Sequence, residues 1–227
     1  MKKLINKIIE EFSIKPTGVY TFINAYSFLK LKSFSAVDQL NGIYLDGILL
    51  VWLLRLFGYK INRFSFDMTS IAPTIFNYAT VNNKSICFVG STEENLNKAT
   101  ENIKKIFPKL NICSTHNGYF LNDLKMKEYI CKLSNINPDI VIVGMGTPKQ
   151  EKFLIELVNG GWKGVGYTCG GFYHQTAQKI NYYPKIFDKF HIRWLYRIYK
   201  EPRLITRYII MYPLGLVQFC FELIIKK

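Results

Sequence analysis

The stretch VGMGTPKQE, residues 143–151, contains residue types that bind phosphorylated ligands where a strand gives way to a helix. Glycines follow an apolar run, and such a turn leaves backbone N–H groups that favour a diphosphate. The same residues also fit helix capping, with Thr147 as N-cap, Pro148 at the first helical position and Gln150 at the third. Neither a G-x-G-x-x-G nor a Walker spacing is present, so the sequence leaves both interpretations open.

Asp46 and Gly47 end a second apolar run and open a helical pattern. A carboxylate at the end of a strand can deprotonate an attacking hydroxyl group if burial tunes its pKa. The alternative is that Asp46 caps the following helix. In TCGGFYHQTAQ, residues 168–178, two glycines allow close approach to a ligand, and His174 and Gln175 suit sugar hydroxyls. His174 also fits a loop histidine with its hydrogen bonds made inside the protein.

Other kinds of site are not indicated. The three histidines lack ligand spacing and no D-x-D pair occurs, so we expect no metal and no other cofactor. No G-x-S-x-G elbow points to a Ser-His-Asp triad. The five cysteines are scattered and never in C-x-x-C spacing, which favours a reducing cytoplasm over a disulfide framework. The basic N-terminus reaches Glu10 and Glu11 before any long apolar run, which argues against a signal peptide.

Apolar strand-like runs alternate with helical patterns along the chain. Six runs predict strands, at 18–25, 42–47, 85–91, 110–118, 138–146 and 164–171. Four patterns predict helices, at 48–58, 92–107, 121–134 and 148–158, the second with capping-box spacing at Ser91 and Glu94. Strands separated by such helices form parallel units covered on both faces. We therefore expect a Rossmann-like, doubly wound α/β domain over residues 1–184, with ligands at the carboxyl ends of its strands.

The chain carries a formal net charge of +14, which indicates an anionic partner such as nucleic acid, an acidic membrane or a phosphorylated substrate. Beyond Pro184, basic residues recur at steps of four and three opposite aromatic and aliphatic ones, which predicts an amphipathic helix. The pair Glu201-Pro202 should end it.

The apolar run at 208–225, interrupted by Pro213 and Glu222 among others, is marginal for spanning a bilayer. We expect residues 185–227 to form a basic helical appendage that lies on an anionic membrane, at the inner face of the cell membrane. The alternative is a helical hairpin packed on the domain, with its lysines and arginines as a solvated face.

Taken together, these stretches resemble the WecG/TagA/CpsF family of bacterial glycosyltransferases (glycosyltransferase family 26). The resemblance runs from about Thr21 to Arg207, with its pieces in family order. They are TFINA with Asn24, the Asp46-Gly47 block, FVGSTEENLNKA leading to FPKLNICSTHNGYF, the G-x-P-x-Q-E signature in VGMGTPKQEKF, a Gly-Gly block, and RWLYRIYKEPRLITRY. Six pieces in this order are highly specific.

The resemblance implies an inverting, metal-independent transferase that moves a sugar, often N-acetylmannosamine or its uronic acid, from UDP onto an undecaprenyl-diphosphate-linked acceptor for cell-surface polysaccharide. It implies that Asp46 is the base and that Gln150 lies near the nucleotide sugar. It also implies a basic appendage that binds the membrane and completes the site, with Arg197, Arg203 and Arg207. The other residues expected to bind substrates are Thr21, Asn24, Arg63, Gly90, Gly144, Gly146, Thr147, Pro148, Glu151, Gly171, His174 and Gln175. The family also allows a homo-oligomer.

The sequence departs from the family pattern at several positions. His174 takes the place of an acidic residue, and 182–184 read Tyr-Tyr-Pro in place of Arg-Ala-Pro. Residues 193–194 are Arg-Trp in place of Glu-Trp, Phe22 stands where a threonine is usual, and the R-x-x-G-x-D block is RFSFD at 63–67. The fold and the reaction class remain as expected, whereas the donor or acceptor sugar is left open.

Three other functions fit parts of the sequence. A nucleotide-sugar binding protein without catalysis would be unaffected by Asp46→Asn. A nicotinamide-dependent oxidoreductase would share the α/β plan, but the glycine fingerprint is missing. A nucleic-acid binder is argued only by charge, and the basic residues cluster beside apolar runs rather than on a sheet with stacking aromatics. We therefore expect no nucleic-acid partner.

Overall fold

Six strands form one sheet in the computed structural model, which describes residues 4–190 and 192–226. The strands are β1 (Gly18–Ile23), β2 (Gly42–Leu45), β3 (Ser85–Gly90), β4 (Asn111–His116), β5 (Ile140–Gly144) and β6 (Val165–Thr168). Their order across the sheet is β2-β1-β6-β5-β3-β4, and every neighbouring pair is parallel. The six predicted strands are confirmed, each somewhat shorter than expected.

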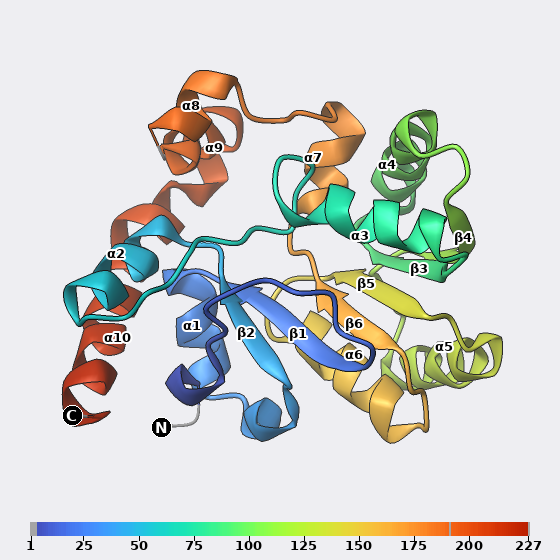
Figure 1. Cartoon of the computed structure of the whole chain (residues 1–227), viewed down its shortest axis with the longest axis horizontal. Coiled ribbons are helices and arrows are strands. Elements are labelled where there is room, and N and C mark those ends of the chain that lie inside the picture. The colour runs from blue at the N-terminus through green and yellow to red at the C-terminus, as the bar shows by residue number, and fades with distance from the viewer. Residues whose placement is uncertain (1–3, 191, 227) are drawn as a thin grey trace.

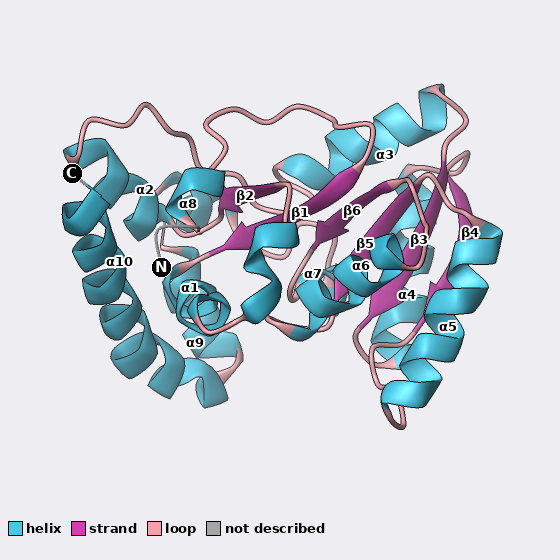
Figure 2. Ribbon diagram, turned by 90° about the horizontal axis from the view of Figure 1, so that it is seen from below, coloured by secondary structure: helices cyan, strands magenta, loops and turns pink. Residues whose placement is uncertain are grey.

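Helices cover both faces of this sheet (Figures 1 and 2). One buried cluster joins the sheet to α1 (Ala25–Lys32), α2 (Ile48–Leu56), α5 (Asp123–Ile136) and α6 (Lys149–Asn159). The other joins it to α3 (Ile71–Val81), α4 (Glu93–Ile106) and α7 (Phe172–Gln178). Successive strand residues face opposite sides, so Val141 enters the first cluster and Ile142 the second. Strands that are apolar on both faces are typical of a parallel sheet, and the doubly wound α/β prediction is confirmed.

The four predicted helices are present as α2, α4, α5 and α6, whereas α1, α3 and α7 were not predicted. Helix α3 carries Pro73 near its start and β-branched residues after it, which weakens a helical signal. The predicted capping box at Ser91 and Glu94 is wrong. Thr92 is the N-cap of α4, with its hydroxyl accepting from the Asn95 N–H at 3.3 Å, because Ser91 is in the left-handed region (φ 58°) and lies one residue too early.

The predicted amphipathic segment after Pro184 forms two helices, α8 (Lys185–Lys189) and α9 (Arg193–Lys200). Helix α9 ends before Glu201, as the following proline predicted, and a short 3-10 helix, η3 (Pro202–Leu204), comes next. A π-helical turn, η4 (Arg207–Met211), then leads into α10 (Tyr212–Lys226), and it falls just before Pro213, where an N–H is missing from the ladder. Residues 202–225 are together long and apolar enough to cross a membrane, with a mean hydropathy of 1.8 over an 18-residue window within them.

Helix α10 runs alongside α1 (Figure 2). Phe219 packs edge-on against Phe28 with ring centroids 5.0 Å apart, and Glu222 lies 3.7 Å from the Lys32 ammonium. Gly215 permits the close approach, because a Cβ there would lie 2.2 Å from the Ala25 carbonyl oxygen. One face of α10 therefore belongs to the buried core. This packing agrees with the alternative stated above, in which the C-terminal helices pack on the domain.

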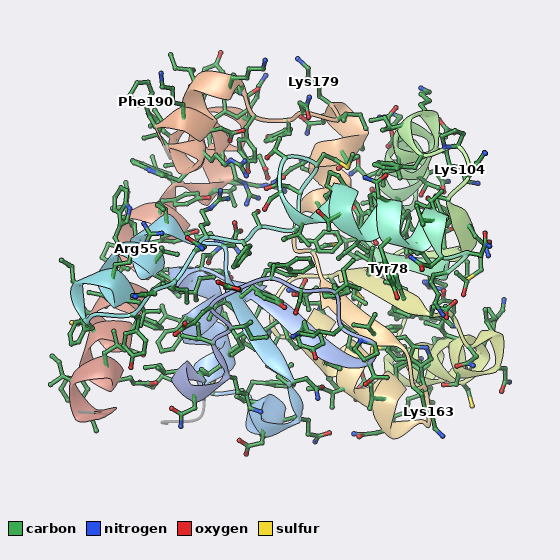
Figure 3. The ribbon with its side chains drawn as sticks, viewed as in Figure 1. Arg55, Tyr78, Lys104, Lys163, Lys179 and Phe190 are labelled. Atoms are coloured by element: carbon green, nitrogen blue, oxygen red, sulfur yellow. The ribbon has the colours of Figure 1, made fainter. Side chains whose placement is uncertain are left out.

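Several exposed basic side chains lie far from the appendage. Lys104 on α4, Lys163 after α6 and Lys179 after α7 are all exposed and lie at well-separated places (Figure 3). The arginines at the start and middle of α9 instead point inward, as described below.

Candidate functional site

A cavity of about 520 Å³ lies between the carboxyl ends of the central strands and the helices α9 and α10. Most of the predicted site residues line it, namely Asn24, Asp46, Arg63, Gly146, Thr147, Gln150, Gly171, His174, Gln175, Arg197, Arg203 and Arg207. Residues from distant parts of the sequence therefore share one cavity, where parallel sheets usually bind their ligands.

Asp46 follows β2 directly and is held by Arg63. The Arg63 Nη2 donates to the Asp46 Oδ1 at 2.9 Å, and its Nε donates to the main-chain carbonyl of Asp46 at 2.6 Å. The alternative that Asp46 caps α2 is wrong, because Gly47 is the N-cap and no side chain caps that helix. The Asp46 side chain is 34% exposed, so its carboxylate is oriented and still within reach of a ligand.

Asn24 joins β1 to α1 next to Asp46. Its Oδ1 accepts from the Ser27 N–H at 3.1 Å, and the Ser27 hydroxyl accepts from the Asn24 N–H at 2.7 Å, which is a capping box. The Asp46 N–H donates to the Ile23 carbonyl at 2.8 Å. These bonds fix the ends of β1 and β2 against each other.

The VGMGTPKQE stretch does not form the predicted capping box. Thr147 and Gln150 turn their side chains to the carboxylate of Glu151, which accepts from both at 3.2 and 3.1 Å, so no side chain caps α6. The Gln150 Oε1 accepts from the Gly170 N–H at 3.3 Å. Gln150 therefore ties the turn after β5 to the turn after β6, and both turns line the cavity.

The Glu151 carboxylate also accepts from the Thr21 hydroxyl at 2.7 Å. Both residues are fully buried. Burial raises the pKa of Glu151 above its ordinary value of 4.5, although hydrogen bonds from Thr21, Gln150 and Thr147 oppose the shift. This buried network supports the cavity from below.

Five residues predicted to bind substrate lie, in the described structure, outside the cavity lining: Thr21, Gly90, Gly144, Pro148 and Glu151. For Thr21 and Glu151, burial beneath the cavity is the reason. Gly90 and Gly144 serve strand packing, because a Cβ on Gly90 would lie 2.4 Å from the Gly144 carbonyl oxygen. Pro148 is the N-cap residue of α6. These five residues therefore support the site from outside the cavity lining, and their contact with substrate stays a prediction.

The turn after β6 contributes Gly171, His174 and Gln175. The His174 Nε2 lies 3.0 Å from the Gln178 amide and 4.0 Å from the Glu201 carboxylate. Gln175 donates from Nε2 to the Tyr183 hydroxyl at 3.2 Å. His174 thus has partners inside the protein, which agrees with the alternative of a histidine whose hydrogen bonds are made internally. It also lines the cavity.

Helix α9 turns Arg193 and Arg197 toward the cavity, so the alternative of a solvated basic face is wrong for these two arginines. Arg197 is only 20% exposed, and a Cβ on Gly171 would lie 3.3 Å from its Nη2. The exposed residues of this helix are Trp194, Leu195, Tyr199 and Lys200. Burial alone would lower the pKa of Arg197, but neighbouring groups that include Glu201 raise it above the ordinary arginine value, so the side chain is a permanent cation.

Arg203 and Arg207 of the appendage differ from Arg197 in their surroundings. Arg207 stacks over the ring of Tyr26 at 3.7 Å from its centroid. Arg203 is 77% exposed and bonds to Glu201 at 3.1 Å. Arg197 is therefore charged and largely shielded from water, where an electrostatic contact is strongest, whereas Arg203 is not.

The sequence reading did not assign Asp67, Tyr183 or Glu201 to the site, yet all three line the cavity. Arg193 joins them, bonded to Asp67, Asp188 and Thr69 and packed over the Tyr183 ring. The sequence held one indication of the contact between Asp67 and Arg193: the segments 63–67 and 193–194 both depart from the family pattern. The two altered segments meet in space, which a single sequence does not reveal.

Within residues 4–190 and 192–226, no three His, Cys, Asp or Glu side chains gather into a set that could ligate a metal. The positive charge at the cavity is supplied by arginines, among which Arg193 and Arg197 of the appendage are only 13% and 20% exposed.

Comparisons with known proteins agree with this geometry. The family model described as "Glycosyl transferase WecG/TagA/CpsF family" matches residues 1–227. A UDP-Gal:α-D-GlcNAc-diphosphoundecaprenol β-1,4-galactosyltransferase of Shigella boydii is 37% identical over 223 residues, 98% of this chain and 93% of that protein.

Two further relatives are N-acetylglucosaminyldiphosphoundecaprenol N-acetyl-β-D-mannosaminyltransferases. The protein of Bacillus spizizenii is 25% identical over 69% of this chain and 60% of its own length. That of Staphylococcus aureus strain MW2 is 30% identical over 57% of this chain and 50% of its own length.

Proposed function

The chain belongs to the WecG/TagA/CpsF family of glycosyltransferases, and we propose that it transfers galactose from UDP-galactose to a GlcNAc residue on a lipid diphosphate. It is a UDP-sugar-dependent enzyme, and its proposed setting is the synthesis of a bacterial cell-surface polysaccharide. N-acetylmannosamine is the second candidate for the transferred sugar.

The choice of galactose rests on the pattern of similarity. The galactosyltransferase aligns with almost the whole chain, whereas the mannosaminyltransferases align with little more than half to two thirds of it. The departures at His174 and 182–184 lie at the cavity or beside it, which supports a sugar other than N-acetylmannosamine.

The observation that carries the reaction is the orientation of Asp46 by Arg63 at the edge of the cavity. The proposed step begins when the Asp46 carboxylate takes the proton of the acceptor hydroxyl. That oxygen attacks the anomeric carbon of the donor from the face opposite UDP, and a C–O bond forms. The bond to the phosphate oxygen breaks, its electron pair leaves with UDP, and the configuration is inverted.

The leaving diphosphate gains negative charge as this bond breaks. Arg197, buried against the turn at Gly171, is proposed to stabilise that charge together with backbone groups of the turns at 146–147 and 170–171. Fixed charges in a shielded cavity need no reorganisation during the reaction, which supports a mechanism without a metal.

Peripheral binding to the inner face of the cell membrane is also proposed, with residues 185–227 as the appendage that mediates it. Leu214, Val217 and Phe221 form an exposed apolar side of α10, while the opposite side packs on α1. A helix with one buried and one exposed apolar side suits lying in the surface of a bilayer.

UDP release from a panel of UDP-sugars tests this proposal. The acceptor is a synthetic lipid-diphosphate-GlcNAc in anionic vesicles, and EDTA is present throughout. We expect release that depends on the acceptor and is fastest with UDP-galactose. Faster release with UDP-N-acetylmannosamine would reverse the choice of sugar. Release that is absent with EDTA and appears only when divalent metal is added in excess of the EDTA would refute the proposed stabilisation by arginine.

A further inference from the structure

The cavity has two chemically different linings. Asp46, Arg63 and Arg197 provide charge, whereas α2 and α10 provide a set of apolar side chains that we call the apolar arm: Ile48, Leu49, Leu50, Tyr212, Pro213 and Leu216. A nucleotide sugar presents hydroxyls, phosphates and a uracil edge, and each would lose hydrogen bonds to water against such a surface. The apolar arm therefore fits a hydrocarbon and leaves the donor to the charged lining.

The apolar arm continues to the outside of the molecule. Helices α2 and α10 pack against each other, and in both views they lie at the same end of the structure (Figures 1 and 2). Leu49 lines the cavity and is also 36% exposed, and Trp52 one turn further along α2 is 47% exposed. On α10, Leu216 faces the cavity while its neighbour Val217 is exposed. Apolar side chains of both helices thus lie in the cavity and on the surface beside it.

We propose that the apolar arm holds the first isoprenoid units of the acceptor lipid, and that the chain leaves for the bilayer between α2 and α10. This assignment rests on the proposed function, because only an acceptor with a lipid diphosphate carries such a chain. The acceptor diphosphate would then lie near the arginines of the appendage, and its sugar near Asp46.

The placement also explains two features that the reaction does not require. Helix α2 has exposed apolar residues although Leu50, Val51 and Leu54 on its other side are in the core. The exposed apolar side of α10 begins beside the mouth of the apolar arm. A bilayer that covers both helices would shield these residues and receive the lipid chain where it emerges.

Acceptor chain length provides the test. The KM of Leu49→Gln is measured with two lipid-diphosphate-GlcNAc acceptors, one with a long polyisoprenoid chain and one with a short alkyl chain. We expect the ratio of the long-chain to the short-chain KM to rise roughly tenfold, since a polar group replaces a buried methyl contact. Leu216→Gln should act in the same direction, and Leu124→Gln, an exposed leucine on α5, is the matched control with an unchanged ratio.

Fluorescence of Trp52 gives an independent measurement. With Trp162 and Trp194 replaced by phenylalanine, emission should be quenched by vesicles that carry brominated acyl chains. Sedimentation with vesicles but no quenching of Trp52 would overturn the proposed exit route, and so would an unchanged KM ratio in both glutamine variants. A chain that transfers sugar to neither acceptor would instead refute the proposed function itself. Protection of Trp52 by self-association in the absence of lipid would assign this surface to a second copy and overturn the inference.

Discussion

The carboxylate of Asp67 and the guanidinium of Arg193 form an ion pair that fastens helix α9 to the segment carrying Arg63. Both side chains are nearly buried, at 11% and 13% exposure. Thr69 bonds to both partners, through Asp67 Oδ1 and Arg193 Nη2. The pair therefore links the orientation of the proposed base, through Arg63, to the position of Arg197.

Removal of one partner should be costly. Arg193→Met leaves Asp67 buried without its cation, and we expect the free energy of unfolding to fall by about 3 kcal/mol. Urea denaturation measures this value, and Arg203→Met, at the exposed arginine, is the control with little effect. The double variant with Asp67→Asn should be no worse than Arg193→Met alone, and additive losses would show that the two side chains are not coupled.

The pH dependence of this stabilisation has a definite sign. Burial raises the pKa of Asp67, but the charge of Arg193 and the hydrogen bonds from Thr69 outweigh it and hold the pKa below 3.8. A carboxylate with a lowered pKa stabilises the folded protein above the unfolded pKa, and that contribution is lost as the pH falls through the folded value. Stability of the wild type should therefore drop more steeply below about pH 4 than that of Asp67→Asn.

Glu151 should behave in the opposite way. Its pKa is raised by burial, so the folded state favours the protonated form, and this preference is lost as the pH rises from 4.5 through the folded pKa. Glu151→Gln keeps an oxygen for Thr21, Thr147 and Gln150 without the charge. We expect its thermal unfolding temperature to vary less between pH 4 and 8 than that of the wild type. Equal slopes for the two proteins would contradict the raised pKa.

Arg197 is expected to act on the leaving group. Arg197→Lys keeps the charge but loses the planar fork, and we expect kcat/KM for the UDP-sugar to fall roughly 10²-fold. The matched comparison is Arg203→Lys, which changes an exposed residue and should cost less than tenfold. UDP release measures kcat/KM for both variants. Similar losses of kcat/KM would mean that the burial of Arg197 against Gly171 gives it no larger role than the exposed Arg203.

Much of this architecture was predictable because the strands and the long helices have clear patterns of apolar residues. Runs such as 140–144 are apolar at every position, and the helices between them are long enough to show a period. The short helices α1 and α7 were missed, since eight and seven residues carry too few periods to stand out. Helix α3 was missed because Pro73 and its β-branched neighbours argue locally against a helix that tertiary packing nevertheless stabilises.

The site was predictable in composition more than in geometry. Asp46, Gln150 and the appendage arginines were named, and the structure brings them to one cavity. The inward direction of Arg193 and Arg197 was not predicted. A repeat of basic residues along a helix does not indicate which side of the helix contacts a carboxylate. Thr21 and Glu151 were taken as ligand contacts because their depth below the cavity depends on how β1 meets α6, which no local pattern encodes.

The most direct test of the account is the activity of Asp46→Asn. The variant keeps the size of the side chain and an oxygen for the Arg63 bond, but it cannot accept a proton as a carboxylate does. We predict that UDP-sugar binding, measured by calorimetry, is nearly unchanged, while acceptor-dependent UDP release falls by about 10³-fold. Release at the wild-type rate would contradict the role of Asp46 as the base and remove the central step of the proposed mechanism.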